Sequence, residues 1–161
     1  MIVYVIGGIL LYFYLSHFLS YSILRKKILK RQKWDINICC GKTDGGGINV
    51  DISQHADVPH FILIKDIYNL PFRDQQFNTV LCSHTIEHVE NPERFFRELK
   101  RIGKKVTIVL PPLWDMTAAL NVFEHKYIFL CLKKEHTELP PYVRLPLASY
   151  LHKRFGQKIK A

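Results

Sequence analysis

The first part of the chain is one long run of uncharged, mostly apolar residues. Residues 2–24, IVYVIGGILLYFYLSHFLSYSIL, contain no Asp, Glu, Lys or Arg. A helix needs ~20 mostly apolar residues to cross the hydrocarbon core of a bilayer, so this run can span it with some tilt. It is longer than the apolar part of a signal peptide, and no small-residue cleavage site follows it. We therefore predict a retained membrane-spanning helix over residues 1–24, with a signal peptide or a buried core helix as the alternatives.

A basic segment follows this run directly. Six of the nine residues in 25–33, RKKILKRQK, are Lys or Arg, and we call this segment the basic collar. Positive charge beside a span is retained on the cytoplasmic side, which predicts that residues 25–161 are cytoplasmic and that the amino terminus lies on the opposite face. Anionic lipid headgroups are the expected partners of the collar, at ~1 kcal/mol per basic residue near the surface.

Beyond the collar, short apolar runs alternate with turns. These runs are nearly all apolar rather than alternating, which is typical of strands in a parallel sheet whose two faces are both covered. The expected strands are residues 36–40, 48–52, 61–64, 77–82 and 106–110.

One helix is clearly marked between the last two strands. In the segment 92–102 the apolar residues stand at 95, 96, 99 and 102, which is a helical period. Asn91 suits the cap of this helix and Pro92 its first turn. Strands joined by such crossovers predict an α/β fold, an open, mostly parallel, doubly wound (Rossmann-like) sheet of about five strands, preceded by the membrane helix.

The folded domain is expected to occupy residues 34–161, with its core in 35–112. The remainder, 113–161, is less regular. The pattern there allows a helix over 117–132, whereas three prolines make 139–147 irregular. Residues 148–160 form a basic, weakly amphipathic end that suits contact with a membrane or a partner.

Composition adds little beyond the collar. The chain has 161 residues, 23 Lys and Arg, 14 Asp and Glu, and a net charge of +9. Without the collar, 17 basic residues face 14 acidic ones, so the excess falls to +3 and nucleic acid is not an expected partner. Cys39, Cys40, Cys82 and Cys131 show no metal-binding spacing such as a CxxC pair, so we expect reduced thiols in a cytoplasmic domain.

Residues able to bind a ligand follow four of the expected strands. Ligands of open α/β sheets bind beyond the carboxyl ends of the strands. Gly41 follows the first strand, where the missing side chain lets a ligand approach the backbone. Asp51 lies at the end of the second strand, where a carboxylate can accept both hydroxyls of a ribose. Asp66 follows the third strand, and Ser83 and His84 follow the fourth.

A more specific pattern lies between the third and fourth strands. It reads Asp66-x-x-x-Leu70-Pro71-Phe72, followed by FNTVLC and then SHTIEHV. With INICCGK and GGGINVDIS before it and KKVTIVLPP after it, the segment 35–112 resembles the class I S-adenosylmethionine-dependent methyltransferases, of the short type with an abbreviated first crossover.

The resemblance implies a cofactor, S-adenosylmethionine, and a role for each matching residue. Gly41 would lie against the methionine part of the cofactor, Asp51 would bind its ribose and Asp66 its adenine amine. Ser83 and His84 would line the cleft for cofactor and substrate. The expected cofactor-binding residues are Cys40, Gly41, Asp51, Ile52, Asp66, Ser83 and His84.

The first loop departs from this family's pattern, Asp-x-Gly-x-Gly-x-Gly. Asn37, Cys39 and Thr43 stand at the acidic position and at two glycine positions, and only Gly41 remains in register. Ten positions separate Gly41 from Asp51, too few for a full crossover helix, which leaves a tight loop or an eroded cofactor site. The family's closing antiparallel hairpin is not identifiable after residue 112, and a second copy of the chain in a homo-oligomer could supply it.

The letters His84-Thr-Ile-Glu87-His88 also fit the H-x-x-E-H pattern of zinc peptidases. That chemistry needs both histidines on one face of a stable helix and a third ligand downstream. A new helix begins only a few residues later, so we expect no metal site here, and we expect His125 and His136 to be packing or surface residues. We predict instead that His88 is the catalytic residue, a base in the methyl-transfer cleft.

These features together predict a membrane-anchored S-adenosylmethionine-dependent methyltransferase at the cytoplasmic membrane surface. A lipid-linked or small-molecule acceptor suits the tether, since anchoring raises the local concentration of membrane substrates. The alternative is a degenerate, non-catalytic methyltransferase-fold module that binds or scaffolds a partner at the membrane.

Overall fold

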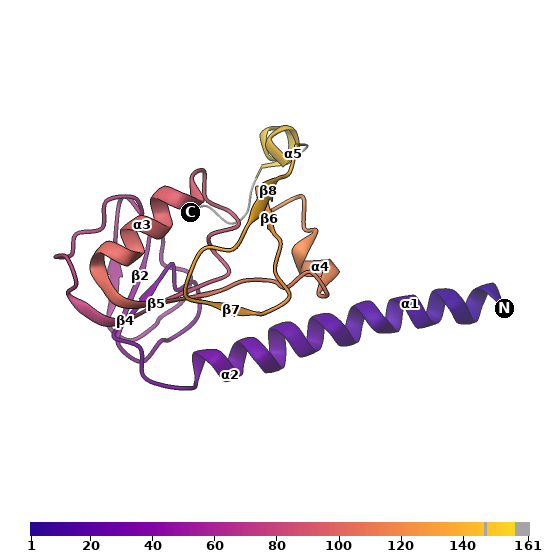
Figure 1. Ribbon diagram of the computed structural model, residues 1–161, viewed down its shortest axis with the longest axis horizontal. Coiled ribbons are helices and arrows are strands. Elements are labelled where there is room, and N and C mark those ends of the chain that lie inside the picture. Colours follow the sequence, from indigo (N-terminus) through magenta and orange to yellow (C-terminus); the bar gives the residue numbers. More distant parts are fainter. Residues whose placement is uncertain (147, 157–161) are drawn as a thin grey trace.

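The computed structural model describes residues 1–146 and 148–156, and a six-stranded sheet forms its centre (Figure 1). The strand order is β3-β2-β1-β4-β5-β7. The first five strands are parallel, and β7 is antiparallel to β5. The predicted open, mostly parallel sheet is therefore confirmed. The strands are β1 (Ile36–Ile38), β2 (Ile48–Asp51), β3 (Phe61–Leu63), β4 (Phe77–Ser83), β5 (Gly103–Val109) and β7 (Glu135–His136).

The predicted helix between β4 and β5 is confirmed as α3 (Pro92–Ile102). The side chain of Asn91 accepts a hydrogen bond from the backbone N–H of Arg94, which caps the helix as expected. Phe95 and Leu99 are fully buried on the face that packs on the sheet. Burial of each large apolar side chain of this kind stabilises the fold by about 1.5–3 kcal/mol.

The first crossover is a tight loop, one of the two outcomes that the sequence left open. Asn37 and Asn49 are paired neighbours on β1 and β2, and both are buried. The Nδ2 of Asn37 donates to the carbonyl oxygen of Thr43 at 2.9 Å, and the Oδ1 of Asn49 accepts from the backbone N–H of Gly45 at 3.0 Å. Two buried amides in otherwise apolar strands thus hold the loop against the sheet, where a crossover helix would otherwise lie.

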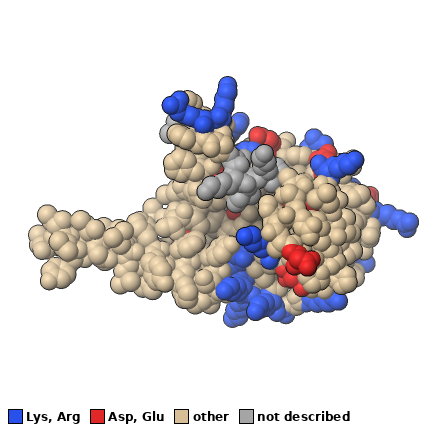
Figure 2. All heavy atoms as spheres, turned by 180° about the vertical axis from the view of Figure 1, so that it is seen from behind, with Lys and Arg blue, Asp and Glu red and all other residues tan. Residues whose placement is uncertain are grey.

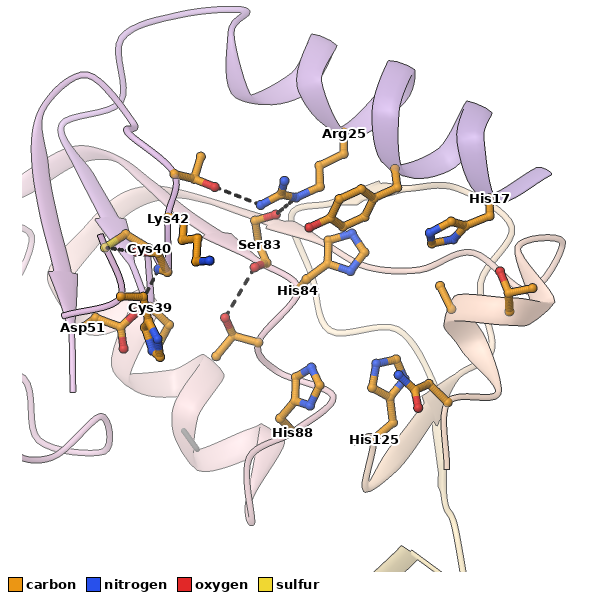
Figure 3. A pocket seen from close by; sticks show the side chains of 18 residues that line it. His17, Arg25, Cys39, Cys40, Lys42, Asp51, Ser83, His84, His88 and His125 are labelled. Atoms are coloured by element: carbon orange, nitrogen blue, oxygen red, sulfur yellow. Dashed lines mark hydrogen bonds between the residues drawn. The ribbon is translucent and has the colours of Figure 1, made fainter. Parts of the chain in front are cut away.

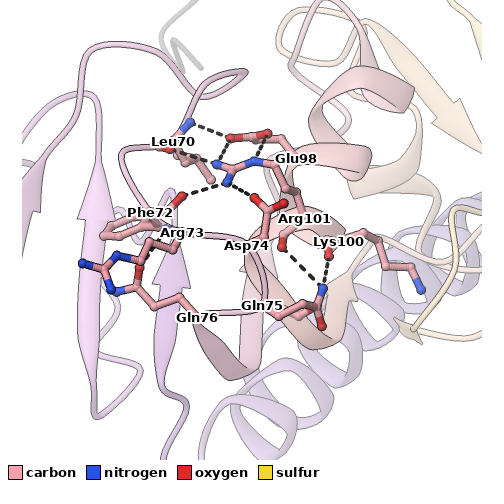
Figure 4. Close-up of polar contacts among 10 residues, drawn as sticks. Leu70, Phe72, Arg73, Asp74, Gln75, Gln76, Glu98, Lys100 and Arg101 are labelled. Carbon is pink, nitrogen blue, oxygen red and sulfur yellow. Dashed lines mark hydrogen bonds and ion pairs between the residues drawn. The ribbon is translucent and has the colours of Figure 1, made fainter.

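The loop between β3 and β4 is held by a side chain of α3 (Figure 4). Arg101 donates to the carbonyl oxygens of Leu70 and Phe72 at 3.0 and 2.8 Å and pairs with Asp74 at 2.7 Å. The carboxylate of Glu98 accepts a hydrogen bond from the guanidinium of Arg101 and another from the backbone N–H of Leu70. The Leu-Pro-Phe part of the sequence pattern therefore has a structural role, because it supplies the backbone groups that fix this loop.

The amino-terminal helix is a continuous rod of 28 residues that is long and apolar enough to cross a membrane. It consists of α1 (Ile2–His17), a π-helical stretch η1 (Phe18–Arg25) and α2 (Lys26–Leu29). Figure 1 shows the end near the amino terminus projecting away from the domain. Figure 2 shows no charged side chain on that projecting end, and blue Lys and Arg side chains where the rod joins the domain.

The second half of the rod packs on the domain. The hydroxyl of Tyr12 donates to the carbonyl oxygen of Trp114 at 3.1 Å, and the Nδ1 of His17 lies 3.2 Å from the Oδ1 of Asp115. Further along, Lys134 donates from its Nζ to the hydroxyl of Ser20 at 2.8 Å.

These contacts limit how the predicted span can sit in a bilayer. Residues 2–11 alone reach about 15 Å beyond the first domain contact, or half of a hydrocarbon core. A span over the whole range 1–24 would require the contacts of the second half to separate.

The carboxyl-terminal part differs from the sequence expectation. The helix expected over 117–132 is wrong, because α4 (Met116–Ala119) ends after one turn and β6 (Tyr127–Phe129) follows. The segment expected to be irregular contains β8 (Tyr142–Arg144), which pairs with β6. The basic end forms α5 (Ala148–Phe155), and residues 157–160 of that prediction lie outside the described part of the chain.

Candidate active site

A cavity of about 460 Å³ opens at the carboxyl ends of β1, β2 and β4 (Figure 3). Three parts of the chain form its walls: the loops after these strands, the segment around α4, and the amino-terminal rod. This volume is in the range of small-molecule sites. The lining residues are His17, Tyr21, Arg25, Cys39, Cys40, Gly41, Lys42, Thr43, Asp51, His55, Ser83, His84, Thr85, His88, Thr117, Ala118, Asn121 and His125.

The loop after β1 is held by the carboxylate at the end of β2. Gly41 has a φ of 57°, a left-handed conformation that costs glycine nothing, and its backbone N–H donates to the Oδ2 of Asp51 at 2.8 Å. The Oδ1 of Asp51 accepts from the backbone N–H of Ile52 at 2.7 Å. Cys39 has a φ of 54° although it is not glycine, so the loop stores backbone strain beside the cavity.

The end of β4 meets the amino-terminal rod. The Nε of Arg25 donates to the hydroxyl of Ser83 at 3.1 Å, and its Nη2 donates to the hydroxyl of Thr43 at 3.0 Å. The ring of Tyr21 lies 5.6 Å from the ring of His84, edge to face. One turn of the rod thereby closes the cavity between the loops after β1 and β4, as Figure 3 shows for Arg25.

Sequence reasoning did not identify the rod as part of the site. A signal was nevertheless present, because the polar residues of the apolar run recur at helical spacing on one face. Ser16 and Ser20 are both buried against the domain, and His17, Tyr21 and Arg25 line the cavity. Polar residues within the apolar run are therefore the residues that dock the rod on the domain.

The floor of the cavity holds three imidazoles around one carboxylate. Glu87 is fully buried, and the Nδ1 of His84 lies 3.4 Å from its Oε1. The rings of His88 and His125 are 4.7 Å apart and also buried. Burial alone would raise the pKa of the Glu87 carboxyl, but the three imidazoles outweigh burial and hold this pKa well below its ordinary value.

Most of the predicted site residues meet in this cavity. Its lining includes Cys40, Gly41, Asp51, Ser83 and His84, together with the predicted base His88. Their binding and catalytic roles stay predictions.

Two predicted cofactor-binding residues do not line the cavity. These are Ile52 and Asp66. Asp66 is exposed, and its Oδ1 accepts from the backbone N–H of Tyr68 at 2.8 Å, which closes a local turn. The cysteines, by contrast, are free thiols as expected, and burial raises the pKa of the Cys39 and Cys82 thiols, which keeps them protonated at neutral pH.

Comparison with known sequences identifies the class of the central segment. Residues 46–110 match the family described as a methyltransferase domain. This match supports the predicted methyltransferase class and its cofactor, S-adenosylmethionine. No curated protein sequence matches the chain.

Several solved structures are similar to the methyltransferase segment and its surroundings. A SAM-dependent methyltransferase of Thermotoga maritima has 22% identity and a TM-score of 0.41, over 62% of this chain and 56% of its own. A SAM-dependent methyltransferase of Aquifex aeolicus has 16% identity and a TM-score of 0.43, over 57% of this chain and 65% of its own. The chain thus spans only between half and two thirds of these structures. Because the TM-scores are low, the fold assignment rests on the sheet order described above.

Proposed function

We propose that the chain is a membrane-anchored S-adenosylmethionine-dependent methyltransferase. It acts at the cytoplasmic membrane surface on a lipid-linked or small-molecule acceptor. The observation that carries this proposal is the pair formed by Asp51 and Gly41 at the cavity, inside or beside the segment that matches a methyltransferase domain.

The donors around the cavity fit the chemistry of the cofactor. Asp51 uses each carboxylate oxygen for one backbone N–H, and each oxygen keeps a lone pair for a ribose hydroxyl. Arg25 donates to Ser83 and Thr43 and retains further N–H groups, which suits the methionine carboxylate. Gly41 places no side chain between the loop and a ligand, since nothing lies within 4 Å of where a Cβ would be.

When bound, the cofactor supplies a sulfonium methyl group that is attacked in line by the acceptor. The chain's own contribution is position and the exclusion of water. The rod covers the cavity beside Ser83, while the cluster around His88 lies on the opposite side, next to the space that an acceptor would fill (Figure 3). His88 is the residue that we propose acts on the acceptor.

Membrane attachment is proposed through the amino-terminal rod. Its first residues are apolar and largely exposed, including Tyr4 and Leu10, with 85% and 62% of their surface accessible. Such an exposed apolar surface favours insertion into a bilayer, and the basic collar at the other end of the rod favours contact with anionic headgroups. The positive charge of the collar favours a cytoplasmic position for the domain.

Transfer of labelled methyl groups tests this proposal. The full chain, reconstituted in vesicles made from the total lipids of its source cells, is incubated with methyl-labelled cofactor and the cells' small metabolites. We expect protein-dependent label in the lipid or the metabolite fraction, lost in Asp51→Ala and kept in the control variant Asp57→Ala, an exposed acid outside the cavity. Cofactor binding without any transfer would favour the non-catalytic module instead.

A further inference from the structure

The cluster on the floor of the cavity contains groups that hydrogen bonding does not satisfy. Both carboxylate oxygens of Glu87 are buried and make no hydrogen bond of good geometry with the residues that the structure describes, although the Nδ1 of His84 lies 3.4 Å from Oε1. The Nδ1 of His125 is in the same situation. Unpaired buried polar atoms are rare in folded proteins, and a buried carboxylate needs a compensating charge.

The two histidines can each offer one ring nitrogen to a ligand. The Nδ1 of His88 lies 2.9 Å from the carbonyl oxygen of Glu124, so it carries the proton and Nε2 keeps a lone pair. The Nδ1 of His125 is buried without a hydrogen-bond partner among the described residues, and in the neutral tautomer with the proton on Nε2 it offers a lone pair. Metal-binding histidines typically donate from their second ring nitrogen to a carbonyl or carboxylate, as His88 does.

The three side chains converge. One ligand atom from each of Glu87, His88 and His125 lies within 4.8 Å of the others. A carboxylate oxygen and an imidazole nitrogen that carries no proton each offer a lone pair to a cation. Lone pairs that point together without a proton between them form a site for a cation.

We propose that Glu87, His88 and His125 bind a divalent transition-metal ion, with zinc as the best match. Two imidazoles and one carboxylate are the ligands of a catalytic zinc site that keeps a fourth position open. His88 and His125 line the cavity, so the open position faces it and takes water or an acceptor oxygen. The Nδ1 of His84, 3.4 Å from Glu87, is placed to orient the carboxylate.

The sequence argument against a metal ion does not apply to this site. That argument required a stable helix around His84 and His88, by analogy with zinc peptidases. In the structure the third ligand is His125, which follows α4 in a loop, so no long helix is needed. The role of His88 toward the acceptor would then be to hold the metal rather than to accept a proton.

Zinc titration of the full chain tests the site without reference to methyl transfer. The protein is purified in detergent, stripped with EDTA, freed of chelator and titrated against a chromophoric zinc indicator. We expect one zinc per chain, with affinity weakened more than about 100-fold in Glu87→Gln and in His125→Gln. The matched control is His136→Gln, a histidine on β7 outside the cavity, which should bind zinc as the parent does.

The cobalt-substituted parent gives a second measurement that does not depend on the folding of any variant. Visible absorption of four- or five-coordinate cobalt without a thiolate charge-transfer band supports ligation by imidazole and carboxylate. A thiolate band would assign the metal to the cysteines and overturn the proposal. Zinc binding by folded Glu87→Gln and His125→Gln at the parent affinity, or less than about 0.1 zinc per folded parent chain, would overturn it as well.

Discussion

The guanidinium of Arg25 donates to the hydroxyl of Ser83 at 3.1 Å, so a side chain of the amino-terminal rod reaches the end of the central strand β4. The same residue binds Thr43 in the loop after β1. The rod is therefore part of the cavity wall as well as a candidate anchor. Removing it would open the cavity, and any test of cofactor binding should use the full chain.

Replacing Arg25 should weaken cofactor binding. Arg25→Met keeps much of the side-chain length but removes the charge and the bonds to Ser83 and Thr43. Loss of charge-assisted hydrogen bonds worth about 1.5–3 kcal/mol predicts a rise of roughly tenfold or more in the Kd for S-adenosylmethionine. The measurement is isothermal titration of both proteins in detergent.

The control for this prediction is Arg31→Met, since Arg31 pairs with Glu135 away from the cavity. It should bind the cofactor like the parent. Equal Kd values for Arg25→Met and the parent would show that Arg25 does not contact the cofactor.

The depth of the rod in the bilayer can be measured by photo-crosslinking. A photoreactive residue at Ile6, which is exposed on the projecting end, should give lipid adducts in vesicles. The same residue at Ser20, which is fully buried against Lys134, should crosslink to the domain. Lipid adducts of equal yield at both positions would mean that the rod leaves the domain and spans the bilayer over residues 1–24.

The buried amide of Asn49 should be a large contributor to stability. It accepts from the N–H of Gly45 at 3.0 Å and donates to Asp44 and the carbonyl oxygen of Pro59, both at 2.8 Å. Asn49→Ala leaves buried backbone groups unpaired, which predicts a loss of about 2–3 kcal/mol in the free energy of unfolding. Urea unfolding followed by fluorescence measures it.

The exposed Asn78, whose side chain accepts a hydrogen bond from Lys104, gives the matched control. Asn78→Ala should change the free energy of unfolding by less than about 0.5 kcal/mol. A similarly small effect of Asn49→Ala would mean that the first crossover loop does not depend on this amide.

Lys134 should make stability rise with pH. Burial lowers the pKa of Lys134 from 10.5 to about 8, against the raising effect of Asp115 and Glu87. Between these two values the unfolded chain binds more protons than the folded one, so the free energy of unfolding increases with pH, by at most about 1.4 kcal/mol per unit. Comparing the parent with Lys134→Met from pH 8 to 9.5 isolates this residue, and parallel curves would contradict the assignment.

The sheet was predictable because the residue pattern of its strands is local in the sequence. Apolar runs such as residues 106–110 favour a sheet buried on both faces, and Asn91 and Pro92 mark the start of α3 without tertiary information. The prediction of a helix over residues 117–132 was wrong. There Asp115 caps a single turn, its side chain accepting from the N–H of Ala118, and the pairing of β6 with the distant β8 overrides the local helical pattern.

The site was predictable only where it follows the strand ends. Asp51 is the last residue of β2 and His84 directly follows β4, so parallel topology brings them together. Arg25 and His125 reach the cavity through packing of the rod and of the segment after α4, and no local pattern specifies those contacts. The helical spacing of Ser16 and Ser20 was the one available hint that the rod has a face for the domain.

Binding of S-adenosylmethionine by the folded full chain tests the central claim most directly. Isothermal titration in detergent should give saturable one-to-one binding with a submillimolar Kd. Asp51→Ala should weaken it by about tenfold or more, because the carboxylate both bonds the hydroxyls and fixes the loop at Gly41. No binding at millimolar cofactor, by a full chain shown to be folded by circular dichroism, would contradict the proposed methyltransferase.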